Sequence, residues 1–158
     1  RDLVRSRGLG DVYKRQLDVL TGEHPELKVS LFGYTEWLMY ADHNLDRFCK
    51  YDTYIPSTFY YNAYSSRVKA FEQRYRARFG SSMMDYLPRF AITGYDHGMY
   101  FLRGMISQGR DFDGSLEDKT ALQTYLHFTR PKVGGGYRNQ SLLFVHYNRD
   151  KSISIINF

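Results

Sequence analysis

The chain of 158 residues is about one domain long, enough to bury a single hydrophobic core. Fifteen Tyr and eleven Phe supply apolar area that offsets chain entropy, and this aromatic content excludes an intrinsically disordered chain. Of the formal net charge of +5, the first sixteen residues supply +3 (five basic residues against two acidic ones), and the remaining +2 does not indicate a nucleic-acid-binding protein.

Residues 1–16 show neither a helical nor a strand period and have no helix cap. The segment resembles a translated sequencing-adaptor artefact, so we expect a non-native, disordered leader that packs against nothing. A native basic linker is the alternative. If the segment is an artefact, the natural N-terminus is missing, and a signal peptide would have been lost with it.

The rest of the chain begins with the pattern of an α/β fold. Residues 28–33 predict a short strand that ends in a glycine turn, and residues 37–50 have the apolar spacing of a helix. Residues 52–61 are aromatic and rich in β-formers. Because Pro56 cannot donate a hydrogen bond to a ladder, this segment predicts an edge strand or two short strands around a bend.

Two helices and a hairpin are predicted further along. Residues 66–79 form a helix that Gly80 ends, and its basic side chains are interpreted as a solvated face. A helix is also expected over 116–128. Strands at 141–147 and 152–158, joined by a turn-type sequence, predict a C-terminal β-hairpin.

A further helix, 89–108, contains three interior glycines, Gly94, Gly98 and Gly104. Each costs about 1 kcal/mol of helix propensity relative to alanine. Such a cost suggests that a neighbouring backbone approaches closely. We therefore expect a buried packing helix in which Gly94 and Gly98 face a neighbouring element.

Three short motifs occur in order along the chain. The first is LFG at 31–33, before a polar loop; the second is FEQRYRARFG at 71–80, followed by AITGYD at 91–96; the third is Gly136 leading to LFVHY at 143–147. This ordered set resembles the C-terminal portion of type 1 periplasmic solute-binding proteins, the branched-chain amino-acid receptor class. It is most similar to Bacteroidota members that are often fused to a peptidoglycan-binding LysM module.

The resemblance implies that residues 17–158 are the C-terminal part of a two-lobed α/β fold with Rossmann-like lobes. Residues 28–61 and 141–158 would belong to one lobe and 65–130 to the other. A parallel sheet completed by upstream strands would follow, and its truncated strands would expose apolar surface. The positions expected to be exposed are Val29, Leu31 and Leu143.

The resemblance also points to ligand-binding residues. In amino-acid-binding relatives, the loop after the strand that matches 28–33 contributes an acidic residue that holds the ligand's ammonium group. The matching loop here is Tyr34, Thr35, Glu36 and Trp37. The Glu36 carboxylate would accept a charge-assisted hydrogen bond, and Tyr34 or Trp37 would add a cation–π face. The alternative, which is favoured, is that Glu36 complements a helix dipole.

Tyr95 and Asp96 match the YD pair of the family's helix. Asp96 would act in lobe packing or at the rim of the cleft, and packing is favoured. The five histidines lack metal-site spacing, and no nucleophile motif is present, so we expect no metal, no cofactor and no catalytic site. The single cysteine, Cys49, is expected to be a buried structural thiol.

These observations predict an extracytoplasmic solute-binding module of a transport receptor or envelope sensor, located in the periplasm or cell envelope. Its expected partner is a small amino-acid-like or polar molecule. The resemblance adds ABC-transporter membrane subunits, or peptidoglycan contacted through a missing domain. An envelope scaffold that keeps the fold without binding ligand is the alternative, and an α/β enzyme is the third. No membrane span and no nucleic-acid partner are expected.

Overall fold

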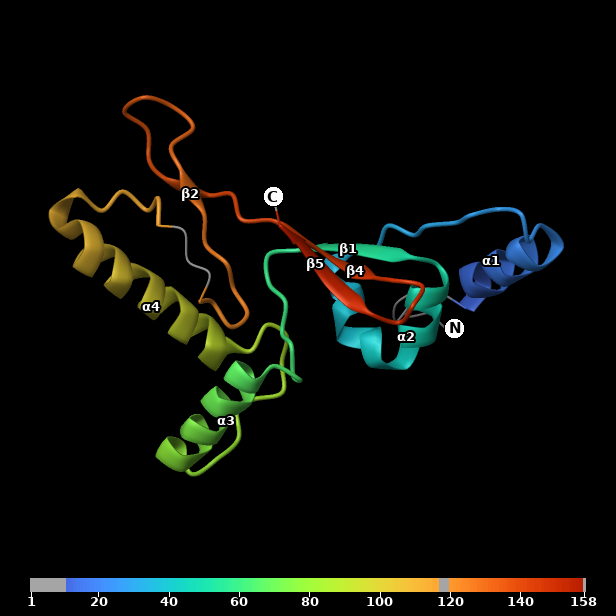
Figure 1. Cartoon of the computed structure of the whole chain (residues 1–158), viewed down its shortest axis with the longest axis horizontal. Helices are drawn as coiled ribbons and strands as arrows, with labels where there is room; N and C mark the ends of the chain where they lie inside the picture. The colour runs from blue at the N-terminus through green and yellow to red at the C-terminus, as the bar shows by residue number, and fades with distance from the viewer. Residues whose placement is uncertain (1–10, 117–119, 158) are drawn as a thin grey trace, which may run out of the picture. The chain divides into compact units, whose positions relative to one another are not determined.

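The computed structural model describes residues 11–116 and 120–157 and has a mixed α/β fold (Figure 1). The chain divides into two compact units. Unit 1 comprises the described residues up to Ser57 together with Leu143–Asn157, and unit 2 comprises Thr58–Leu142. The sequence grouped the chain in a similar way into two lobes, and that these units are lobes of a binding protein stays a prediction. Among the described helices, none is long and apolar enough to cross a bilayer.

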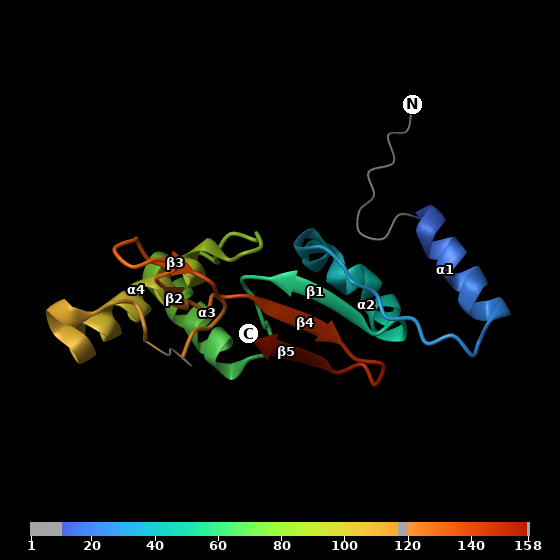
Figure 2. The same cartoon turned by 90° about the horizontal axis from the view of Figure 1, so that it is seen from above.

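Unit 1 is built on a three-stranded sheet in the order β1 (Thr53–Ser57), β4 (Leu143–Tyr147) and β5 (Ile153–Asn157) (Figure 2). Both pairs are antiparallel, with Val145 opposite Ile55 on one side and Ile155 on the other. The predicted C-terminal hairpin is therefore confirmed. The expectation of a parallel sheet is wrong for β1, β4 and β5.

The segment 28–33 lies beside the free edge of β1 but forms only an isolated bridge. Phe32 and Tyr54 are bridge partners in parallel, and the backbone N–H of Gly33 donates to the carbonyl of Tyr54 at 2.8 Å. Leu31 accepts from the N–H of Tyr54 at 2.8 Å. The predicted strand is thus shortened to a parallel contact that extends the sheet beyond β1.

One face of the sheet packs against η1 (Thr35–Tyr40) and α2 (Ala41–Lys50), which together replace the single helix expected over 37–50. Phe48 is central to this core, stacking on Trp37 at 5.7 Å and contacting Tyr147 at 5.2 Å. Alternation along β4 buries Leu143 on the same face, where it is 1% exposed. The expectation that Leu143 is exposed is therefore wrong, because η1 and α2 cover this strand face.

Val29 and Leu31, the other two positions expected at an exposed strand edge, are half-buried. The segment that contains Val29 and Leu31 lies along the edge of β1. The N–H of Leu31 donates to the carbonyl of Tyr51, and the carbonyl of Leu31 accepts from the N–H of Tyr54. Cys49 is buried, as expected of a structural thiol.

Helix α1 (Asp11–Glu23) begins inside the segment that was expected to be a disordered leader, so that expectation is wrong for residues 11–16. Residues 1–10 lie outside the described residues. Asp18 attaches α1 to α2: its carboxylate accepts from the Tyr51 hydroxyl at 2.6 Å and pairs with Lys50 Nζ at 3.0 Å and Arg47 Nη2 at 2.9 Å. The helix is held by these tertiary contacts, which a periodicity argument does not include.

Unit 2 contains α3 (Ser66–Phe79), α4 (Phe90–Gln108), η2 (Gly109–Asp111) and a short pair, β2 (Phe128–Thr129) with β3 (Arg138–Asn139). Gly80 ends α3 with a φ of 69°, as predicted. The helix expected over 116–128 is wrong for residues 120–128, which run as an irregular segment into β2; residues 117–119 lie outside the described residues. Thr124 bridges to Phe59 within this segment.

The core of unit 2 centres on Tyr100 of α4, which is 1% exposed. Its ring lies 5.9 Å from both Phe112 and Phe128, and its hydroxyl donates to the carbonyl of Gly114 at 2.5 Å. Gly104 of the same helix is buried directly under the Phe112 ring. Aromatic side chains from three separate segments thus meet on one face of α4.

Gly94 and Gly98 lie on the other side of α4 and are exposed. A Cβ built on either would meet no described atom within 4 Å. The prediction that these two glycines face a neighbouring element of the fold is therefore wrong. Of the three interior glycines, only Gly104 is required by packing within the fold.

Candidate functional site

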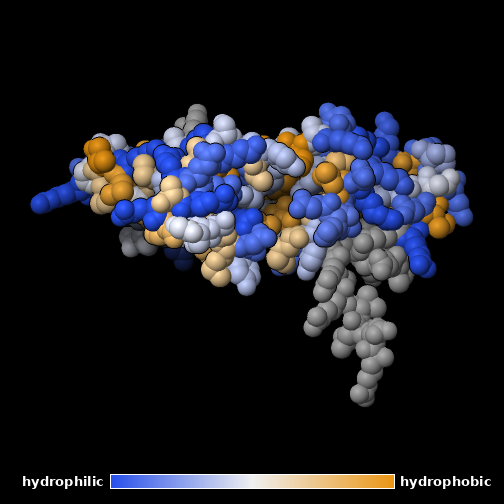
Figure 3. All heavy atoms as spheres, turned by 90° about the horizontal axis from the view of Figure 1, so that it is seen from below, coloured by the Kyte–Doolittle hydropathy of each residue, from blue (hydrophilic) through white to orange (hydrophobic). Residues whose placement is uncertain are grey.

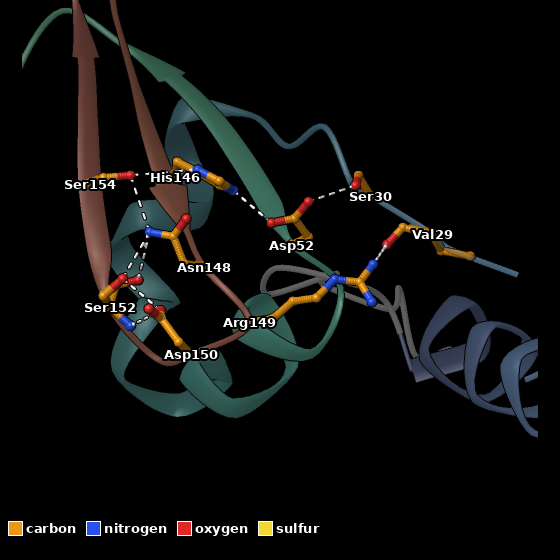
Figure 4. Close-up of polar contacts among 9 residues, drawn as sticks. All are labelled: Val29, Ser30, Asp52, His146, Asn148, Arg149, Asp150, Ser152 and Ser154. Carbon is orange, nitrogen blue, oxygen red and sulfur yellow. Dashed lines mark hydrogen bonds and ion pairs between the residues drawn. The ribbon is translucent and has the colours of Figure 1, made fainter. Parts of the chain in front are cut away.

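A row of polar side chains crosses the sheet of unit 1 on the face opposite the core (Figure 4). We call Ser30, Asp52, His146 and Ser154 the His146 row. His146 Nε2 lies 2.7 Å from Asp52 Oδ1, and the Ser30 hydroxyl donates to Asp52 Oδ2 at 2.9 Å. On the far side of the imidazole, Nδ1 lies 3.5 Å from Ser154 Oγ.

Strand register and one unusual backbone conformation assemble this row. His146 in β4 is paired with Ser154 in β5 and with Tyr54 in β1, so the three side chains share a face. The Tyr54 ring stacks on the imidazole at 3.9 Å with an interplanar angle of 12°. Asp52 has a φ of 47° in the turn before β1, and Asp is among the residues that tolerate this left-handed conformation.

The His146–Asp52 pair is only partly solvated: the side chains are 12% and 25% exposed. The hydrogen bond with His146 is the largest cause that holds the pKa of the Asp52 carboxyl below its usual value, and the bond from Ser30 adds to it. A neutral imidazole protonated at Nε2 would donate to Asp52 and leave Nδ1 as an acceptor, with the Ser154 hydroxyl oxygen 3.5 Å away.

The β4–β5 turn adjoins the row. Asn148 Nδ2 donates to Ser154 Oγ at 3.1 Å and to Ser152 Oγ at 3.0 Å, and Asp150 accepts from the N–H of Ser152 at 2.9 Å. Arg149 donates to the carbonyl of Val29 at 3.0 Å, which fastens the turn to the segment beside β1 (Figure 4). The Ser154 oxygen is thus already engaged by an amide.

A hydroxyl, an imidazole and a carboxylate in sequence are the parts of a general-base system. Here the hydroxyl distance of 3.5 Å exceeds hydrogen-bond reach for proton abstraction, and Asn148 already donates to the same oxygen. The row joins the segment before β1, the turn at Asp52 and strands β4 and β5 on the outer face of the sheet. Sequence reasoning missed it because Asp52 and His146 are 94 positions apart, and the LFVHY motif that contains His146 was interpreted as a feature of the fold and not of a site.

The predicted ligand loop, residues 34–37, follows the segment that runs parallel to β1. The Thr35 hydroxyl donates to the carbonyl of Pro56 at 2.7 Å, which places the loop at the carboxyl end of this parallel pair. Trp37 is a packing residue: it stacks on Phe48, and a Cβ at Gly33 would lie 2.5 Å from its ring.

The other two residues of the loop face solvent. Tyr34 is 70% exposed, and its ring meets Trp37 edge-on at 6.3 Å. Glu36 is exposed in the first turn of η1, the position that the helix-dipole alternative requires. The structure therefore brings the rings of Tyr34 and Trp37 together, leaves Glu36 exposed in the same loop, and fixes the loop through Thr35.

Tyr95 and Asp96 lie in α4 of unit 2. The Tyr95 ring packs against Phe71 of α3 at 4.9 Å. Asp96 is 2% exposed, and its two carboxylate oxygens accept three backbone N–H groups at 2.8 to 2.9 Å. The donors are Leu122, Gln123 and Thr124. In this structure Asp96 thus fixes the irregular segment against α4, which is a packing contact.

Gln123 completes that contact and was not anticipated from the sequence. It is 0% exposed; its Oε1 accepts from the N–H of Arg89 at 2.9 Å and its Nε2 donates to Thr93 Oγ1 at 3.0 Å. The start of α4 is therefore capped by a glutamine more than thirty positions away.

In the part of the chain that the structure describes, no group of three or more His, Cys, Asp or Glu side chains could hold a metal ion. No family model, curated protein or solved structure matches the chain.

Proposed function

We propose that the chain is a solute-binding module that takes a small ligand bearing an ammonium group, of the amino-acid type, as part of a transport receptor or envelope sensor. The observation that carries the proposal is the position of the loop 34–37. Ligands of open α/β sheets bind beyond the carboxyl ends of parallel strands, and this loop follows such an end.

The side chains of the loop suit a cationic group. The exposed Glu36 carboxylate can accept a charge-assisted hydrogen bond from an ammonium ion. Tyr34 offers an aromatic face to the same cation. The edge-on contact with Trp37 limits the motion of the Tyr34 ring. The Thr35–Pro56 bond and the Trp37–Phe48 stack fix the loop backbone, which lowers the entropy cost of binding.

The setting that we propose, the periplasm or cell envelope, rests on the resemblance of the three ordered motifs to periplasmic receptors.

Calorimetric titration with a panel of amino acids tests the proposal. We expect one or more amino acids to bind, Glu36→Gln to weaken that binding at least tenfold, and the matched acid without its amino group not to bind. Glu23→Gln, an exposed glutamate of α1, is the control and should bind as the unchanged protein does. The proposal fails if no amino acid binds, which would favour the scaffold alternative, or if Glu36→Gln binds with unchanged affinity.

A further inference from the structure

The solvent-facing side of α4 is apolar along its whole length. Five large side chains on it are 44–84% exposed. They are Phe90, Phe101, Leu102, Met105 and Ile106. The helix holds two formally charged residues, and Asp96 is buried while Arg103 is half-buried, so neither interrupts this surface. We call it the α4 face. Apolar patches of this kind break up the hydrophilic surface of the protein (Figure 3).

The amount of apolar surface is unusual for a soluble monomer. If a large apolar side chain presents about 200 Å², the five exposed fractions amount to roughly 600 Å². Patches beyond a few hundred Å² mark interaction sites, and a stable interface buries about 800 Å² per partner. The α4 face is large enough to supply most of one side of such an interface.

The two exposed glycines indicate which kind of partner would cover this face. Gly94 and Gly98 lie one helical turn apart in the middle of it, and neither has a positive φ or a described neighbour that would require glycine. Each costs about 1 kcal/mol relative to alanine. Insertion into lipid would gain nothing from glycine, which adds no apolar area. A second helix would gain, because its backbone could approach closely.

The order of small and large residues fits a second copy of the same helix. When two α4 helices cross antiparallel about a two-fold axis beside Gly98, each residue faces the one equally far beyond position 98. Gly94 then faces Leu102, and Phe90 faces Ile106. Gly94 thus gives room to Leu102, the two Gly98 residues let the backbones approach at the axis, Phe90 and Ile106 make apolar contact at the ends, and no charge on the helix faces a like charge. Such self-complementarity is what an isologous interface requires.

We propose that the chain forms a symmetric homodimer through the α4 face, with the two helices antiparallel and in closest contact at Gly98. This interface is independent of the proposed ligand loop, which lies in unit 1.

Sedimentation equilibrium of the full chain from micromolar to millimolar concentration tests the dimer. We expect a monomer–dimer equilibrium that Gly98→Leu weakens at least tenfold, because the new side chain holds the helices apart. The substitution leaves the monomer intact, since the space beside Gly98 is open. The matched control is Gly22→Leu in α1, another helical glycine with open space around it, and it should dimerise normally.

The helix arrangement has its own test. Gly98→Cys should form a disulfide-linked dimer on mild oxidation, and Ala77→Cys on the exposed side of α3 should not. The proposal is overturned if the chain is monomeric at every concentration, if Gly98→Leu dimerises as well as the unchanged chain, or if the monomer instead binds phosphatidylcholine vesicles through this face.

Discussion

His146 Nε2 and Asp52 Oδ1 lie 2.7 Å apart although 94 positions separate the residues in the chain. Asp52 ends the turn between α2 and β1, and His146 lies in β4, so the contact ties the early and late segments of unit 1 together. Ser30 and Tyr54 support the pair from either side, by a hydrogen bond to the carboxylate and by stacking on the imidazole.

The first prediction concerns the pH dependence of stability. The pKa of Asp52 is lowered in the folded state, chiefly by the bond with His146. The pair therefore stabilises the fold above the unfolded-state pKa of about 3.9, and this stabilisation is lost as the pH falls through the lower folded value. Asp52→Asn, which keeps a residue that tolerates a positive φ, should cost about 1–2 kcal/mol at pH 7 and much less at pH 2.

Urea denaturation at several pH values measures this difference. The control is Asp46→Asn, whose carboxylate is 87% exposed and pairs with the exposed Lys151; it should change stability little at any pH. Equal losses for Asp52→Asn at pH 2 and pH 7 would contradict the role of the charged pair.

The second prediction concerns the buried carboxylate of unit 2. Asp96→Asn replaces an acceptor oxygen by an N–H₂ group that faces backbone donors, leaving at least one of them unsatisfied. We expect a loss of about 2–4 kcal/mol in the free energy of unfolding. Asp113→Asn, at an exposed site that also accepts a backbone N–H, should change the free energy of unfolding much less. A loss as small for Asp96→Asn as for Asp113→Asn would show that the buried contact is dispensable.

The sequence pattern correctly predicted those elements that are stabilised by residues close to one another in the chain. The apolar alternation of 143–147 and the turn residues after it predicted the C-terminal hairpin, and Gly80 predicted the end of α3. The segment 120–128 shows where this reasoning fails. Its Leu122, Tyr125 and Leu126 have helical spacing, but Asp96 accepts from three successive backbone N–H groups there, which in the interior of a helix would be bonded to carbonyls four residues earlier.

The candidate sites divide in a similar way. The loop 34–37 was singled out through the resemblance to periplasmic receptors, and within it the structure shows the Tyr34 and Trp37 rings in edge-on contact. The His146 row could not be predicted from the sequence, since it depends on strand register and on the positive φ of Asp52. The near-neutral charge of 17–158 also conceals a division, with −3 in the unit 1 residues and +5 in the unit 2 residues. The two charges become visible only when the residues are grouped by the units of the folded chain.

The third prediction concerns the attachment of α1. Asp18→Ala removes the acceptor that Tyr51, Lys50 and Arg47 share. Hydrogen exchange of the amides of 17–23 should then accelerate about tenfold or more, the factor that 1.4 kcal/mol of lost contact corresponds to. Amides of β4 should keep their protection. Glu23→Ala in the last turn of α1 should leave both sets unchanged, and the attachment through Asp18 is contradicted if the two variants exchange alike.

The fourth prediction separates the two classes of glycine in α4. In Gly104→Ala the new Cβ would overlap the Phe112 ring, which Tyr100 and Phe101 hold at 5.9 and 6.2 Å, so relief requires the aromatic cluster to shift. We expect a loss of about 1–3 kcal/mol from overpacking. Gly98→Ala meets open space and should instead stabilise the monomer by up to about 1 kcal/mol through helix propensity. Thermal denaturation at a concentration at which sedimentation shows the chain to be monomeric measures both changes. Opposite signs are the decisive outcome: if Gly98→Ala also destabilised the monomer, position 98 would have to face an element of its own chain, and the basis for a second copy at the α4 face would be lost.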